Sequence, residues 1–235
     1  MTQSANFKKV QDLITVKRSK RARRVALRLD PVQRIINLVI PERMPLRTAY
    51  AFANKHEDWI KQTLNNLPEK ISFTHGTQLP VFGDKIWLDI TIDPTIRRTT
   101  LKQYDDRLFV KTYQQDPTSR ITTHLKKIAR MGLADMASEK AGIIGKDIAS
   151  VTIRDTKSRW GSCSADGHLS FSWRLIFAPY AAVDYVIAHE IAHLVHLNHS
   201  KSFWELCEKL SCDYKTGKHW MKKRGNTLLC YGQKN

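Results

Sequence analysis

Hydrophobic and polar residues alternate through the first half of the chain in short segments that are typical of β-strands. Residues 25–29 alternate with a period of two up to a break at Asp30-Pro31, and an apolar run covers residues 35–40. These two segments predict paired strands. Residues 45–67 carry apolar side chains at helical intervals and stop at Pro68, which predicts one long helix.

Three further segments before residue 115 have the character of strands. They are residues 85–92, 99–104 and 108–113, and Asp105-Asp106 marks a turn between the last two. The first half of the chain therefore predicts a small mixed sheet accompanied by a helix.

The second half begins with a long amphipathic segment. Apolar residues recur at helical intervals from residue 117 to residue 142, and strand-like segments follow at residues 150–154 and 168–171. In the next apolar segment, residues 180–197, Asp184 and Glu190 are the only charged residues. Because so few charges accompany so many apolar side chains, we expect a buried helix there.

These elements predict an α+β fold made of two parts. Residues 1–115 are expected to form a basic, β-rich N-terminal region with one long helix, and residues 116–235 a second, larger α+β domain. A chain of 235 residues with 42% hydrophobic residues is long enough to bury a substantial core. No low-complexity linker separates the two halves in the sequence, so we expect them to pack together.

The expected buried helix contains the sequence His189-Glu190-Ile191-Ala192-His193. Residues four apart lie on one helix face, so both imidazoles can reach one zinc ion while Glu190 lies beside it. Two histidines and a glutamate are costly to bury, and a bound metal ion compensates that cost. The alternative is a pair of core histidines that are hydrogen-bonded to the backbone.

A catalytic zinc site needs a third protein ligand, and two histidines follow this motif. His196 lies seven residues past His189, about 10.5 Å along a continuous helix, so the three rings would have to lean strongly toward one point. His199 can return over the metal if the helix ends near Leu197 and the chain turns at Asn198. The spacing therefore favours His199.

Several segments of the sequence are characteristic in combination. They are residues 153–164 (IRDTKSRWGSCS), residues 169–175 (LSFSWRL), residues 189–200 (HEIAHLVHLNHS), the pair Phe203-Trp204 and the basic residues 18–28 (RSKRARRVALR). Together they resemble the YgjP-like metallopeptidase family of bacteria, and the resemblance covers most of the chain.

This resemblance implies that residues 116–235 form a zincin-like catalytic domain with one Zn²⁺ ion bound by His189, His193 and His199. It also implies that Glu190 is the catalytic base, which takes a proton from water at the open zinc position, and that the substrate is a peptide or protein. His196 occupies the glycine position of the metzincin pattern, so the chain is placed among the zincins without being assigned to the metzincins. Some members of the family are described as nucleotide hydrolases instead.

Supporting roles have several candidates. The oxyanion could be stabilised by Arg159, His196 or Tyr185, and the histidine ligands could be oriented by Asp155, Asp184 or Asp213. By resemblance, residues 160–164 are expected to form a sheet edge beside the metal that pairs with an extended substrate. Cys163 lies in this edge, either as an incidental thiol or as a further ligand.

The net charge of +17 is the second strong feature of the sequence. Between Lys17 and Arg28 there are seven Lys or Arg residues and no acidic residue. This basic strand could bind nucleic acid or a nucleotide, or it could be a solvated face that maintains solubility.

Three functions follow from these features. The leading hypothesis is a cytoplasmic zinc metallopeptidase, and the alternatives are a metal-dependent nucleoside triphosphate pyrophosphatase or phosphohydrolase and a nucleic-acid-associated protein with a structural zinc. The sequence has no Walker-type glycine loop, which disfavours the nucleotide hydrolase, and Glu190 disfavours a closed structural site. Scattered cysteines, no apolar signal segment and no long apolar run favour a cytoplasmic protein without a membrane partner.

Overall fold

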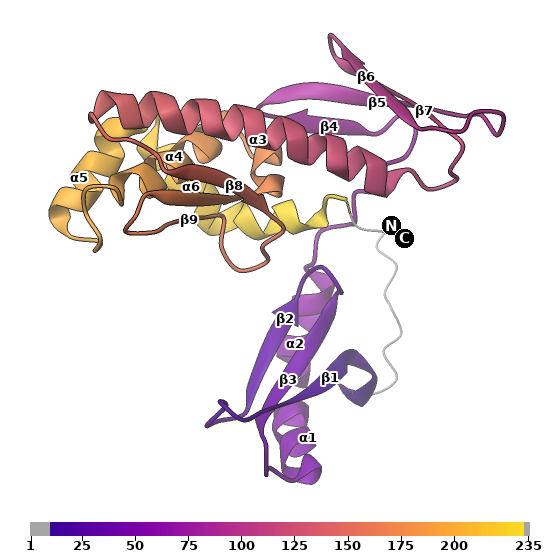
Figure 1. The fold of residues 1–235 in the computed structure, drawn as a ribbon. Helices are drawn as coiled ribbons and strands as arrows, with labels where there is room; N and C mark the ends of the chain where they lie inside the picture. The colour runs from indigo at the N-terminus through magenta and orange to yellow at the C-terminus, as the bar shows by residue number, and fades with distance from the viewer. Residues whose placement is uncertain (1–9, 233–235) are drawn as a thin grey trace. The chain divides into compact units, whose positions relative to one another are not determined.

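Two separate hydrophobic cores organise the chain in the computed structural model, which describes residues 10–232. The chain divides into two compact units, Met1–Glu69 and Lys70–Asn235 (Figure 1). The division thus differs from the boundary expected near residue 115. The physical reason is that strands between residues 78 and 112 bury Leu88, Leu108 and Val110 in the same core as the long helix that follows them.

The first unit combines a three-stranded sheet with two helices. Its elements are a 3-10 helix at Val10–Leu13, β1 (Ile14–Ser19), β2 (Ala26–Asp30), β3 (Ile35–Pro41), α1 (Leu46–Lys55) and α2 (Glu57–Asn65). The strand order is β1-β3-β2, with β1 parallel and β2 antiparallel to β3. The pairing expected between residues 25–29 and 35–40 is confirmed, since Leu27 lies opposite Leu38.

Two expectations for this unit were wrong in detail. The single helix predicted over residues 45–67 is interrupted at His56, and Glu57 and Asp58 begin a second helix, where acidic side chains favourably oppose the helix dipole. The basic residues between Lys17 and Arg28 do not form one strand either. They cover the end of β1, the turn after it and the start of β2.

The second unit starts with a four-stranded sheet. Its strands are β4 (Gln78–Val81), β5 (Asp84–Ile92), β6 (Thr100–Tyr104) and β7 (Arg107–Thr112), in the order β4-β5-β7-β6. The strands predicted at residues 85–92, 99–104 and 108–113 are confirmed to within one residue at each end. One face of this sheet is apolar and buried, as the alternation along β7 requires.

A long helix and a second sheet complete the framework of this unit. They are α3 (Thr118–Ile143), β8 (Ser150–Arg154), β9 (Gly161–Cys163) and β10 (His168–Ser172), and the strand order β8-β10-β9 makes β9 an edge strand. Strand β10 is parallel to β8 and antiparallel to β9, with a turn at Gly167 whose φ of 78° favours glycine. Leu169 and Phe171 of β10 are buried in the core.

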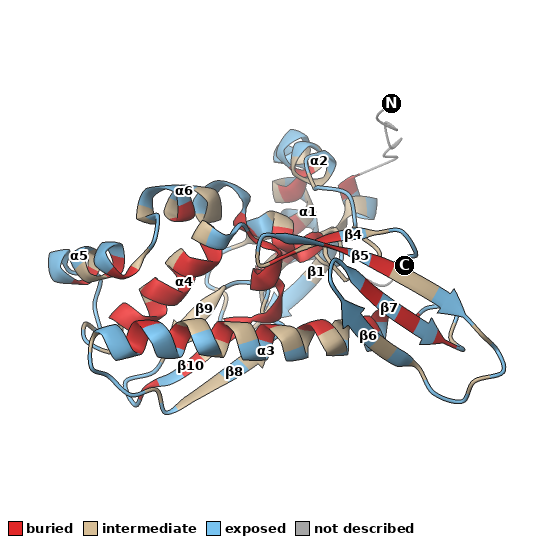
Figure 2. Ribbon diagram, turned by 90° about the horizontal axis from the view of Figure 1, so that it is seen from above, coloured by how far each residue is buried: buried red, intermediate tan, exposed pale blue. Residues whose placement is uncertain are grey.

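The remaining elements surround the central helix of the unit. They are a 3-10 helix at Trp173–Phe177, α4 (Tyr180–Ala192), α5 (Lys201–Leu210), α6 (Tyr214–Arg224) and a 3-10 helix at Gly225–Cys230. Helix α4 packs against α3, α5 and α6 and is mostly buried (Figure 2). Gly217 of α6 allows close approach to α4, because a Cβ there would collide with the Ala181 carbonyl. The fold is therefore α+β, and α4 lies at the centre of the second unit.

Helix α4 ends five residues earlier than the hydrophobic pattern predicts. It stops at Ala192 instead of Leu197, and residues 193–200 form turns and bends before α5. Asn198 does not adopt left-handed geometry, so the expected turn there is wrong in its mechanism. In residues 10–232, no helix combines the length and apolar character required to cross a lipid bilayer.

Candidate metal centre

Three histidines converge at the end of α4. His189 lies in the last turn of the helix, His193 caps it, and His199 arrives from the irregular segment that leads to α5. One ring nitrogen from each residue lies within 4.8 Å of the corresponding nitrogens of the other two. The structure thus brings together all three residues that the sequence nominated as ligands.

The geometry of these nitrogens fits a small tetrahedral ion. The Nε2 atoms of His189 and His199 are 3.1 Å apart. Nitrogens bound to one zinc ion at about 2.0 Å are expected to lie about 3.3 Å from each other, so this spacing is close to that of a metal site. Three neutral imidazoles whose nitrogens converge on one position are also a donor set that binds zinc in catalytic sites.

Hydrogen bonding orients one of the rings. His193 donates from Nδ1 to the carbonyl oxygen of His196 at 3.0 Å, which places the proton on Nδ1 and leaves the Nε2 lone pair for a metal. His196 therefore supports the cluster through its backbone and is not one of its three members. The Nδ1 atom of His189 is buried and has no hydrogen-bond partner among the described residues.

An aromatic wall supports the cluster from α5. Phe203 is fully buried, and its ring centroid lies 4.6–4.9 Å from those of all three imidazoles. Trp204 stacks on His199 at 5.3 Å. Helix α5 is positioned by Ser200, whose hydroxyl accepts from the Phe203 N–H. The sequence showed these aromatics as part of a characteristic segment but did not show that they contact the histidines.

The carboxylate of Glu190 lies beside this cluster in a tightly packed position. Glu190 is 6% exposed, and a Cβ built on Gly161 of β9 would approach its Oε1 to 2.5 Å. A side chain at residue 161 would therefore displace the carboxylate. The requirement for glycine could not be found from local sequence patterns, because α4 and β9 are far apart along the chain.

Burial perturbs the ionisation of both kinds of group. It raises the pKa of Glu190 to about 7, against the opposing effect of the positive charge of Arg159. Burial, with the nearby His193 and His199, lowers the pKa of His189 to about 4. His189 is thus held neutral at physiological pH, which is the form that binds metals, and Glu190 is suited to exchange protons.

A cleft of about 370 Å³ opens onto these groups. Its walls come from α4 and from the edge strand β9, and the residues that line it are Arg159, Gly161, Ser162, Cys163, His189, Glu190, His193 and Leu197. The structure therefore places the segment expected at residues 160–164 beside the histidines, as an edge strand. Cys163 lines the cleft outside the three-histidine cluster, and burial raises the pKa of its thiol to about 11.

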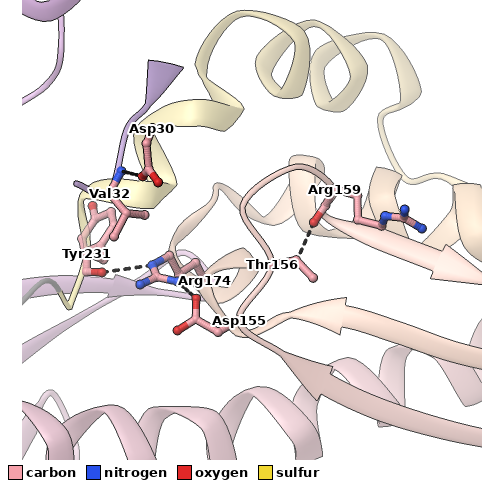
Figure 3. Close-up of polar contacts among 7 residues, drawn as sticks. All are labelled: Asp30, Val32, Asp155, Thr156, Arg159, Arg174 and Tyr231. Atoms are coloured by element: carbon pink, nitrogen blue, oxygen red, sulfur yellow. Dashed lines mark hydrogen bonds and ion pairs between the residues drawn. The ribbon is translucent and has the colours of Figure 1, made fainter. Parts of the chain in front are cut away.

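The three aspartates proposed to orient the ligands have other partners. Asp184 forms a buried ion pair with Lys140 at 2.6 Å and accepts the Cys212 N–H. Asp155 pairs with Arg174 (Figure 3), and Asp213 caps α6. The expectation that one of them holds a ligand histidine was therefore wrong. Each carboxylate is committed to a nearer donor or cation.

All three oxyanion candidates lie near the site, and His196 contacts it through its backbone carbonyl. Arg159 lines the cleft, and the ring centroid of Tyr185 lies 6.1 Å from that of His189. Burial raises the pKa of the Tyr185 hydroxyl above its usual range, so Tyr185 stays neutral.

A convergent three-histidine cluster with a buried glutamate and an open edge strand defines the class of a metal-dependent hydrolase. The family model described as YgjP-like, metallopeptidase domain matches residues 23–224. The chain therefore belongs to the YgjP-like metallopeptidase family and is a metallopeptidase. Peptides or proteins are the substrates that this family implies.

Comparison with solved structures gives a similarity to the metallopeptidase zymogen abylysin from Pyrococcus abyssi. The identity is 25%, the match covers 40% of this chain and 95% of that chain, and the TM-score is 0.35. The comparison with curated proteins gives no match.

Proposed function

We propose that this protein is a cytoplasmic zinc metallopeptidase in which His189, His193 and His199 hold the ion and Glu190 is the general base. The observation that carries the proposal is the convergence of three imidazoles beside one buried carboxylate, with two Nε2 atoms 3.1 Å apart. The free thiols of Cys163, Cys207 and Cys212 are compatible with a reducing compartment.

Residues of this chain have separate roles in the proposed catalysis. When bound, zinc supplies a Lewis acid that polarises water and the substrate carbonyl. Glu190 takes the proton from the attacking water and later delivers it to the amine that leaves. A pKa raised to about 7 suits both directions of this transfer, because the carboxylate neither holds nor releases the proton too strongly.

Positioning is the task of the cleft walls. The free edge of β9 can pair with an extended peptide through backbone hydrogen bonds, which would lay the scissile amide across the histidine cluster. Gly161 keeps the space that the Glu190 carboxylate needs. Arg159 lines the same cleft, and its positive charge could stabilise a developing oxyanion.

Zinc titration of single variants tests the ligand assignment. His199→Ala is expected to weaken zinc binding by at least about 100-fold, because it removes one of three coordinating nitrogens. His196→Ala should leave the affinity within about threefold of the parent protein, because only the backbone of His196 supports the cluster. Equal losses in the two variants would contradict the assignment of His199.

A second proposal concerns the basic segment of the first unit, and we infer that it binds nucleic acid. All seven cationic side chains of residues 17–28 are exposed, and none forms an ion pair with another described residue. Seven unneutralised charges around one turn form a surface that attracts phosphates. The dependence of DNA binding on salt concentration tests this proposal.

A further inference from the structure

A second cavity, of about 350 Å³, adjoins the histidine cleft along β9. The two cavities share Arg159, Gly161 and Ser162 as lining residues. In the sheet, Ser162 lies opposite Ser170, and Ser170 lies opposite Thr152, two residues before Arg154. These residues therefore share the polar face of the sheet, whereas Leu169 and Phe171 point into the core.

The lining of this outer cavity is polar and positively charged. It contains two guanidinium groups and four hydroxyls, from Arg154, Thr156, Ser158, Arg159, Trp160, Gly161, Ser162 and Ser170. The lining residues include no carboxylate. Asp155, the acidic residue next to them in the chain, is paired with the buried Arg174 (Figure 3). Charge and hydroxyl donors together are the chemistry that binds a carboxylate.

The loop that forms the cavity is held at several points. The Thr156 hydroxyl donates to the Arg159 carbonyl at 2.7 Å (Figure 3), and the Ser172 N–H donates to the Trp160 carbonyl at 2.9 Å. Arg174, the partner of Asp155, also donates to the Tyr231 carbonyl at 3.1 Å. The cavity is thus largely preformed, which reduces the entropic cost of binding.

Strand addition connects this cavity to the substrate. Side chains of an extended peptide alternate between the two faces of the sheet that it joins. If a peptide pairs with the edge of β9, one set of its side chains would lie on the same face as Gly161 and Cys163, toward the histidines. The other set would lie on the same face as Ser162, toward the outer cavity. A substrate strand in the cleft would therefore direct one set of its side chains toward the face of the sheet on which the outer cavity opens, and Arg154 of β8, across β10 from β9, lines the wall of that cavity.

We propose that the outer cavity is a specificity subsite for an acidic side chain of the peptide substrate. This inference rests on the proposed peptidase function. Arg154 binds the carboxylate of an Asp or Glu residue, with the hydroxyls of Ser162 and Ser170 as further donors. Arg159 lies between the subsite and the catalytic groups and contributes to both. Arg154 is the specificity-determining residue because, of the two guanidinium groups, it is the one that lines the outer cavity and not the histidine cleft.

A library of blocked peptides, incubated with the zinc-loaded protein and sequenced by mass spectrometry, locates the preferred position. We expect Asp and Glu to be enriched at one position close to the cleaved bond. At that position a Glu peptide should be cleaved with a kcat/KM about 10- to 100-fold above its Gln counterpart, as expected for charge-assisted hydrogen bonds.

Variants of Arg154 separate specificity from catalysis. Arg154→Gln should reduce kcat/KM for the Glu peptide to the level of the Gln peptide, whereas kcat/KM for the Gln peptide should fall by a much smaller factor. Arg154→Glu should shift the preference to Lys at the same position. Lys157→Gln removes one positive charge from the same loop but not from the cavity lining, so the preference for Glu should persist.

The outcomes distinguish the subsite from the proposed peptidase function. Cleavage without an acidic preference, or an equal loss for the Glu and Gln peptides in Arg154→Gln, would overturn the subsite and leave the peptidase function intact. Failure of the zinc-loaded protein to cleave any peptide would overturn both. A preference that Lys157→Gln abolishes as strongly as Arg154→Gln would show a general effect of charge and would also overturn the subsite.

Discussion

The histidine site and the basic segment both gather many polar groups, but they do so in opposite environments. On α4, Glu190 and Asp184 are 6% and 2% exposed, and each has a defined neighbour. On the β1–β2 turn, the cationic side chains are exposed. Because the groups on α4 are buried, replacing any one of them should have a large effect. Exposed charges instead act together and are screened by salt.

The largest effect is expected from removing the carboxylate charge of Glu190. Glu190→Gln preserves the shape of the side chain, so peptide cleavage should fall by about 100- to 10,000-fold while zinc content stays normal. Steady-state kinetics and metal analysis on one preparation measure the rate of peptide cleavage and the zinc content. Loss of zinc in this variant would indicate that Glu190 is a ligand and not a base.

A second test compares buried and exposed ion pairs. Asp184→Asn leaves the buried ammonium of Lys140 without its anion, so the free energy of unfolding should fall by about 3–5 kcal/mol. Glu57→Gln breaks the exposed pair with Lys61 in the first unit and should cost less than about 0.5 kcal/mol. Urea denaturation of the full chain measures both, and similar losses would refute the contrast.

A smaller effect should follow from adding one methyl group to β9. In Gly161→Ala the new Cβ would meet the Glu190 carboxylate, so kcat/KM should fall by about 10- to 100-fold through misplacement of the base. Gly142→Ala is the matched control, because a Cβ there meets no atom within 4 Å. Full activity of Gly161→Ala would show that the carboxylate can move without loss of function.

The smallest effect per residue is expected on the basic segment. Replacing Arg21, Arg23 and Arg24 together with Gln should reduce the slope of log Kd against log salt concentration for duplex DNA by about 2 units. Zinc content should not change. Fluorescence anisotropy over a salt series measures the slope, and an unaltered slope would show that these arginines do not contact phosphates.

Local periodicity was enough to predict most of the elements. The strands β2, β3, β5, β6 and β7 and the helix α3 follow from the alternation of apolar residues, because each pattern reflects one buried face. The spacing of His189 and His193 also places both on one face of α4 whatever surrounds the helix. Element ends were less well predicted, as the early end of α4 at Ala192 shows.

By itself, then, the sequence determined most of the elements, the pair of histidines one helical turn apart, the glutamate between them and the excess of positive charge. Only the tertiary structure decided that Phe203 supports all three imidazoles and that Gly161 lies against Glu190. The tertiary structure also decided that Asp184 forms an ion pair with Lys140 and that residues 70–115 belong to the second unit. The physical reason is that these contacts join segments far apart in the chain, and which segments meet depends on how the whole core packs.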